Sequence, residues 1–181
     1  MKHISNFINR IANWKSFLLF LALYVLFAGY FLKNAEDKIN ALAGKSVGVI
    51  DLTFGYNPSG TLAMIADYGE AARAYYARTE MTTDLLFPIV YAFLLGIALA
   101  LLYRSTSYVW FCIIPFYCLL FDYLENITIV ILLTTFPQQS VSVAILCEIF
   151  KLIKWLLFGA TILLVVVGVF VRLTKRTRLT S

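Results

Sequence analysis

The stretch that decides the fold occupies residues 121–155 and reads FDYLENITIVILLTTFPQQSVSVAILCEIFKLIKW. Long apolar runs extend in both directions from the uncharged turn at 136–140. Each run is near 30 residues, which corresponds to a helix of about 45 Å at 1.5 Å per residue. The hydrocarbon core of a bilayer is only about 30 Å thick. We therefore predict two antiparallel helices, at about 108–136 and 141–171, that protrude outward beyond the membrane.

Charged side chains interrupt these apolar runs, although an ionisable group at the bilayer centre costs about 2.5–3.5 kcal/mol even on the gentler insertion scale. The five residues are Asp122, Glu125, Glu148, Lys151 and Lys154. In antiparallel helices, residues equidistant from the turn lie at the same depth. Glu125 and Lys151 both lie 13 residues from Gln138. Asp122 and Lys154 both lie 16 residues from that centre. The spacing predicts two ion pairs between the helices, Glu125–Lys151 and Asp122–Lys154.

The composition of the whole chain also indicates a membrane protein. Of the 181 residues, 61% are hydrophobic and 14% are charged, whereas a soluble domain has about a quarter charged residues. A compact domain of this length could not bury so much apolar surface, so a soluble enzyme and a disordered chain are excluded. Two further apolar stretches, 16–33 and 84–103, complete four predicted spans. Helices are expected because a backbone in lipid finds hydrogen-bond partners only within its own segment.

The positions of Lys and Arg predict how the four spans are oriented. Eight basic residues, with no acidic residue among them, lie before the first span, between the second and third, and after the fourth. They are Lys2, Arg10, Lys15, Arg104, Arg172, Lys175, Arg176 and Arg178. The positive-inside rule places these segments and both termini in the cytoplasm of a multi-pass cell-membrane protein. Residues 172–181 are then a basic tail held on anionic lipid.

The remaining segments are predicted to lie at the membrane surfaces. Residues 34–83 are too long for a simple connector and predict an outward-facing amphipathic cap, with a helix at about 61–80. Within it, the apolar stretch 47–56 is compatible with either a strand or a packed loop. Apolar positions three and four apart in residues 4–14 predict a helix lying in the membrane interface. Pro115, inside the third span, is expected to kink it.

The charged residues of the spans and the cap form the candidate ligand-binding site. The seven candidates are Arg73, Asp84, Asp122, Glu125, Asn126, Lys151 and Lys154. One interpretation is that they are buried ion pairs that fix the helix register. The other is that they bind a ligand, an ion or a proton. In the second case, acids would hold cationic or hydroxyl groups, and bases would hold anionic head groups.

Three functions are compatible with such a site. The favoured hypothesis is a binding or accessory module for an amphipathic or lipid-like ligand, or for a membrane partner. A second hypothesis is a membrane enzyme acting on a lipid or isoprenoid-like substrate, with Asp122 or Glu125 as general acid or base. A third is a small transporter, which with four spans would have to work as an oligomer.

Motifs for other kinds of chemistry are missing from the sequence. It has no Gly-rich phosphate loop, no H-E-x-x-H and no G-x-S-x-G. The single histidine, His3, argues against a zinc or haem site. The cysteines lie in apolar runs without a C-x-x-C pair, at positions 112, 118 and 147. We expect no cofactor, no metal and no nucleic acid. The expected partners are the lipid bilayer, a lipid-like small molecule, and another copy of the chain or a membrane protein.

Overall fold

The protein is described by a computed structural model over residues 2–104 and 106–177, ranges in which it has helices and loops but no strand. The all-α fold class is thereby confirmed. Within these ranges, four helices are long enough and apolar enough to cross a membrane. They span Trp14–Ala43, Gly69–Tyr103, Val109–Thr134 and Val141–Thr174. The predicted number of such helices is therefore confirmed.

The first of these helices is longer than the apolar run that predicts it. It consists of α2 (Trp14–Leu26), a π-helical segment η1 (Phe27–Leu32) and α3 (Lys33–Ala43), which follow one another without a break. It continues ten residues past position 33 because polar residues also form a helix there. Lys33 pairs with Asp37 at 2.8 Å, a spacing that stabilises helices. Gly44 then ends the helix in a left-handed conformation with φ 70°.

The segment predicted as a cap contains two helices rather than the expected single helix at 61–80. After the short 3-10 turn η2 (Ile50–Leu52), α4 covers Pro58–Asp67 and α5 covers Gly69–Glu80. The prediction of one helix is wrong because Gly69 has a φ of 73°, a left-handed conformation that interrupts the regular helix. Helix α5 leads directly into α6 (Thr83–Tyr103).

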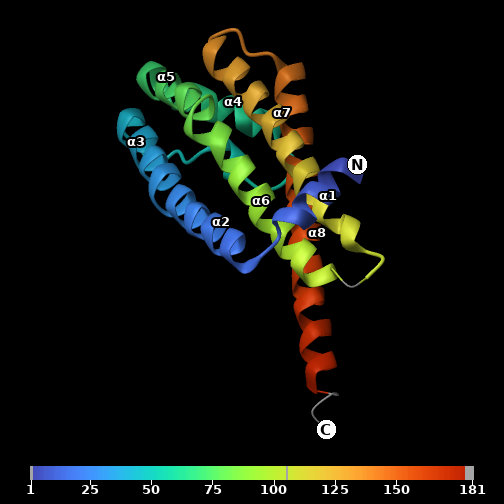
Figure 1. Ribbon diagram of the computed structural model, residues 1–181. Coiled ribbons are helices and arrows are strands. Elements are labelled where there is room, and N and C mark those ends of the chain that lie inside the picture. The colour runs from blue at the N-terminus through green and yellow to red at the C-terminus, as the bar shows by residue number, and fades with distance from the viewer. Residues whose placement is uncertain (1, 105, 178–181) are drawn as a thin grey trace.

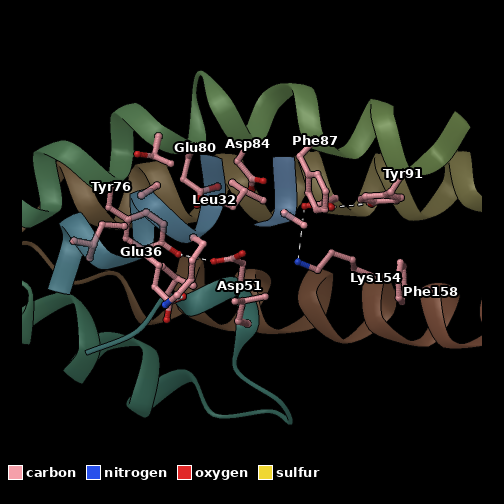
Figure 2. Close-up of a pocket in the computed structure, with 18 of the residues that line it drawn as sticks. Leu32, Glu36, Asp51, Tyr76, Glu80, Asp84, Phe87, Tyr91, Lys154 and Phe158 are labelled. Carbon is pink, nitrogen blue, oxygen red and sulfur yellow. Dashed lines mark hydrogen bonds and ion pairs between the residues drawn. The ribbon is translucent and has the colours of Figure 1, made fainter. Parts of the chain in front are cut away.

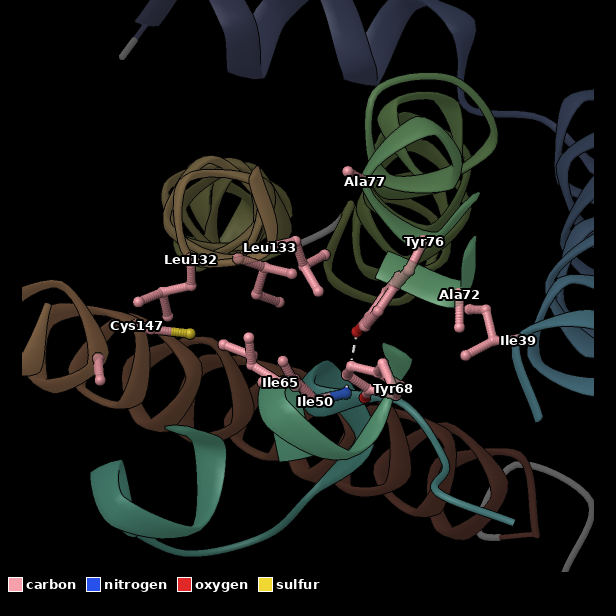
Figure 3. Packing of buried hydrophobic residues seen from close by; sticks show 12 residues of the cluster. Ile39, Ile50, Ile65, Tyr68, Ala72, Tyr76, Ala77, Leu132, Leu133 and Cys147 are labelled. Atoms are coloured by element: carbon pink, nitrogen blue, oxygen red, sulfur yellow. Dashed lines mark hydrogen bonds between the residues drawn. The ribbon is translucent and has the colours of Figure 1, made fainter. Parts of the chain in front are cut away.

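A hydrophobic cluster packs this segment against the helical hairpin (Figure 3). It combines Ile50 and Ile65 with Leu133 and Cys147 from the hairpin, all of them buried. The Tyr76 hydroxyl accepts a hydrogen bond from the backbone N–H of Ile50 at 2.9 Å. The apolar stretch 47–56 is therefore not a strand, and it is packed at Ile50 but exposed at Phe54 and Tyr56. The Tyr68 hydroxyl donates to the carbonyl of Gly48 at 3.0 Å. Burial raises the pKa of Tyr68 well above its ordinary value, which keeps the hydroxyl a neutral donor.

The hairpin itself is formed by η3 (Val109–Ile113), α7 (Ile114–Thr134) and α8 (Val141–Thr177). The prediction that Pro115 kinks the third span is wrong, because α7 begins only one residue before the proline. Proline is tolerated in the first turn, where the missing N–H has no helical partner. Helix α8 runs alongside α7 and continues as one straight helix well past the ends of the others (Figure 1).

The N-terminal helix α1 (Lys2–Ile11) packs on the bundle through α6 and η3. Its Ile8 is fully buried in a cluster with Ile97 and Cys112. The contact is close because Gly96 faces this junction without a side chain. The location of α1 in a membrane interface stays a prediction.

Substitution of Gly96 tests this close contact. A Cβ at Gly96 would lie 3.0 Å from the carbonyl oxygen of Cys112 and 3.1 Å from the ring of Phe116. We expect Gly96→Ala to lower the free energy of unfolding by about 1–3 kcal/mol through overpacking. At Gly159 a Cβ would meet no atom of the described residues within 4 Å. Gly159→Ala should therefore be neutral or stabilise by up to about 1 kcal/mol, as alanine favours helix. Equilibrium unfolding in mixed micelles measures both, and equal effects would contradict the packing at Gly96.

Candidate functional site

A cavity of about 300 Å³ lies between helices that are distant in the sequence. Its wall is formed by α2, η1 and α3, by α5 and α6, and by residues of η2, α7 and α8 (Figure 2). Most of the wall is apolar, and six aromatic side chains contribute to it. They are Tyr24, Tyr76, Phe87, Tyr91, Trp155 and Phe158. A volume of this size is at the lower end of the range for small-molecule sites, roughly 300–1,000 Å³.

The π-helical segment η1 forms part of the cavity wall. Ala28 and Leu32, both within η1, line the cavity. A π-helical turn holds an extra residue and changes which side chains face inward, and such turns are frequent at functional sites. The small side chain of Ala28 leaves space at this point of the wall.

Seven acidic or basic residues among those described also line the cavity, although the surrounding wall is largely apolar. They are Lys33, Glu36, Asp51, Glu80, Asp84, Asp122 and Lys154. In Figure 2, Glu80 and Asp84 point down from their helices toward Asp51, and Lys154 reaches in from α8. The cavity therefore has an acidic wall, formed by Asp51, Glu80 and Asp84.

Lys154 connects α8 to two carboxylates of α7. Its Nζ lies 2.5 Å from Oε2 of Glu125 and 3.8 Å from Oδ1 of Asp122. Tyr91 of α6 donates a hydrogen bond of 2.7 Å to the other oxygen of Asp122. The predicted Asp122–Lys154 pair is confirmed. The predicted Glu125–Lys151 pair is wrong, because Glu125 pairs with Lys154, the same lysine that pairs with Asp122.

Lys151 is directed to a different part of the molecule. Its Nζ lies 2.5 Å from Oε1 of Glu148, one turn earlier on the same helix, and it donates to the Thr53 hydroxyl at 2.6 Å. Glu148 also accepts hydrogen bonds of 2.7 Å from the backbone N–H of Asn57 and from the Thr61 hydroxyl. Both charged side chains are buried, with 2% and 0% exposure. This pair attaches the segment between η2 and α4 to α8.

The acids on the opposite wall have fewer partners. Asp84 accepts a hydrogen bond of 3.1 Å from the side-chain amide of Asn126. Asp51 accepts one of 2.8 Å from the Tyr76 hydroxyl. Glu80 is 3% exposed, and its Oε2 is buried without any hydrogen-bond partner among the described residues. A buried carboxyl oxygen without a hydrogen-bond partner is costly.

The structure brings five of the seven predicted residues to this region. Asp84, Asp122 and Lys154 line the cavity, and Glu125 and Asn126 lie behind them through the contacts described above. Lys151 is not at the cavity. Arg73 is also elsewhere, since its guanidinium lies 3.8 Å from the centre of the Phe136 ring.

Sequence reasoning missed three of the acids that line the cavity, which are Glu36, Asp51 and Glu80. Glu80 lies four residues before Asp84, at the border of the apolar face of the predicted helix. This position could have indicated that Glu80 belongs to the same site as Asp84. Asp51 interrupts the apolar stretch 47–56 and reaches the cavity because the chain folds back there. The backbone carbonyl of Asp51 accepts a hydrogen bond of 3.3 Å from the Trp155 indole.

No metal site is formed by this arrangement. Among the described residues, no group of three or more His, Cys, Asp or Glu side chains is placed to hold a metal ion. Comparison with known protein families, with curated proteins and with solved structures finds nothing that matches this chain.

Proposed function

We propose that the protein is a membrane-embedded binding module whose cavity holds an amphipathic or lipid-like molecule. The observation that carries this proposal is the cavity itself, which combines an apolar aromatic wall with a cluster of carboxylates on one side. Ligand sites of this kind use apolar surface for affinity and a few polar groups for orientation. The ligand's apolar part would lie against Tyr24 and Phe158, and its polar end near Glu80 and Asp84.

The proposal includes a location in a cell membrane with both termini cytoplasmic. The eight basic residues outside the cap support this orientation. The segment 34–83, which supplies Glu36, Asp51 and Glu80 to the cavity, would then lie on the outward side. The acidic wall of the cavity would sit near the outer interface, where an amphipathic ligand places its polar end.

Ala28→Phe tests the proposal because it fills the cavity without changing a charge. Ala22→Phe is the matched control, since Ala22 lies on the same continuous helix but is exposed and does not line the cavity. We expect native mass spectrometry of gently purified protein to detect a bound lipid-like species in the parent chain and in Ala22→Phe. The affinity for this species should fall about 5- to 150-fold in Ala28→Phe, as overpacking costs about 1–3 kcal/mol.

Two results would speak against this function. Equal occupancy in both variants would place the bound molecule outside the cavity. Conversion of the bound species into a product of different mass during incubation would identify an enzyme in place of a binding module.

A further inference from the structure

Acidic side chains outnumber basic ones among the described residues that line the cavity. Five acidic and two basic residues line the cavity. The positive charge of Lys154 is already shared by Glu125 and Asp122. That of Lys33 is taken by Asp37 at 2.8 Å and Glu36 at 3.5 Å. Among the described residues, neither lysine forms an ion pair with a further carboxylate of the cavity.

Three carboxyl groups remain without a cation. Among the residues that the structure describes, no Lys or Arg forms an ion pair with Asp51, Glu80 or Asp84. Asp51 accepts a hydrogen bond from the neutral Tyr76 hydroxyl, and Asp84 accepts one from the neutral side-chain amide of Asn126. Glu80 is the exception, because it is 97% removed from solvent, faces the cavity (Figure 2) and has an oxygen without a hydrogen-bond partner in the described part of the chain. An unpartnered acceptor in such a place indicates a donor that the protein itself does not supply.

The chemistry of the wall narrows the class of donor. A metal ion does not suit it, since the described residues offer no set of three ligands. A hydroxyl group would satisfy one oxygen but would not stabilise the ionised form of a buried carboxyl group. A protonated amine supplies both the hydrogen bonds and the positive charge. The rings of Phe87 and Tyr91, which line the cavity on the same helix as Asp84, also favour a cation.

We propose that the cavity selects cationic amphiphiles, with Glu80 as the main contact of a protonated amine and Asp84 and Asp51 as its neighbours. This inference rests on the proposed function, because it specifies the head group of the ligand that the cavity is proposed to hold. The apolar chain of the amine would occupy the part of the cavity lined by Ala28 and Phe158.

The experiment compares three probes with the same alkyl chain, decylamine, decanol and decanoate. Each is added separately to the full chain in phosphatidylcholine nanodiscs, and occupancy is read by native mass spectrometry. The variants are Glu80→Gln, Ala28→Phe and the control Glu70→Gln, which changes an exposed residue of the same helix α5. We expect decylamine to occupy the cavity about tenfold or more above the other probes. Glu80→Gln should remove this preference, Ala28→Phe should abolish binding of the amine, and Glu70→Gln should change neither.

The outcomes separate the two proposals. If decanol or decanoate binds as well as decylamine, and Ala28→Phe abolishes that binding, the cavity binds ligands but the head-group inference is wrong. The same conclusion follows if Glu80→Gln retains the preference for the amine. If no probe binds and Ala28→Phe changes nothing, the proposed function fails as well. Should Glu80→Gln not fold, as judged by circular dichroism, Asp84→Asn provides the same comparison.

Discussion

Replacing Lys154 with methionine is expected to lower the free energy of unfolding by about 3–5 kcal/mol, the cost of removing one partner from a buried ion pair. The substitution keeps the volume of the side chain but leaves Glu125 and Asp122 without a cation. Glu125 is fully buried and has no other partner among the described residues. Equilibrium unfolding in mixed micelles measures the loss, and a change below about 1 kcal/mol would contradict the arrangement.

A double-mutant cycle identifies which lysine serves Glu125. We expect Glu125→Gln and Lys154→Met to be coupled by roughly 1–3 kcal/mol, since the two side chains are in contact. Lys151→Met is the matched control, because Lys151 is equally buried but pairs with Glu148. Its coupling to Glu125→Gln should be close to zero. Coupling to Lys151 in place of Lys154 would restore the pairing predicted from distances along the chain.

Glu148→Ala is expected to detach the segment between η2 and α4 from the hairpin. Glu148 accepts hydrogen bonds from the backbone N–H of Asn57, the Thr61 hydroxyl and the ammonium group of Lys151, its ion-pair partner. Its removal leaves a buried ammonium group unpaired, at a cost of about 3–5 kcal/mol. Hydrogen exchange should accelerate in residues 50–61, because the local contacts that protect these amides are lost.

The control for this substitution is Glu70→Ala, which removes the same side chain from an exposed position. It should change stability by less than about 0.5 kcal/mol and leave the exchange pattern unaltered. If Glu148→Ala alters global stability without faster exchange in residues 50–61, the attachment of this segment depends on the hydrophobic cluster instead.

Distances along the chain predicted the depth of the charged residues but not their direction around the helix. Counting from the turn matched Asp122 with Lys154 correctly. It failed for Glu125 because residues at equal depth meet only if both also face the partner helix. Lys151 and Lys154 are three residues apart, which turns one side chain about 60° away from the other around α8. Lys154 faces α7, whereas Lys151 faces Thr53 and Glu148.

The boundaries of the helices were predictable only where composition changes. The long apolar hairpin ends at the uncharged turn, as expected. The first long helix continues to Ala43 because helix formation also tolerates polar residues, which a hydropathy argument ignores. The break at Gly69 depends on a local backbone angle, and a glycine in a helical pattern does not by itself predict it.

The sequence by itself determined that the chain forms four apolar helices suited to a bilayer, because composition and periodicity depend on the solvent that each residue meets. It also identified Asp84, Asp122 and Lys154 as members of the candidate site, since charges in apolar runs are costly wherever they point. Only the tertiary structure decided that these residues share a cavity with Asp51 and Glu80. Those two acids lie outside the apolar runs that predict the four spans, and their significance arises only when α3, α5 and η2 pack around the same space. The charge balance of the cavity is a property of that packing, because each lysine can neutralise only the carboxylates that the fold brings within reach.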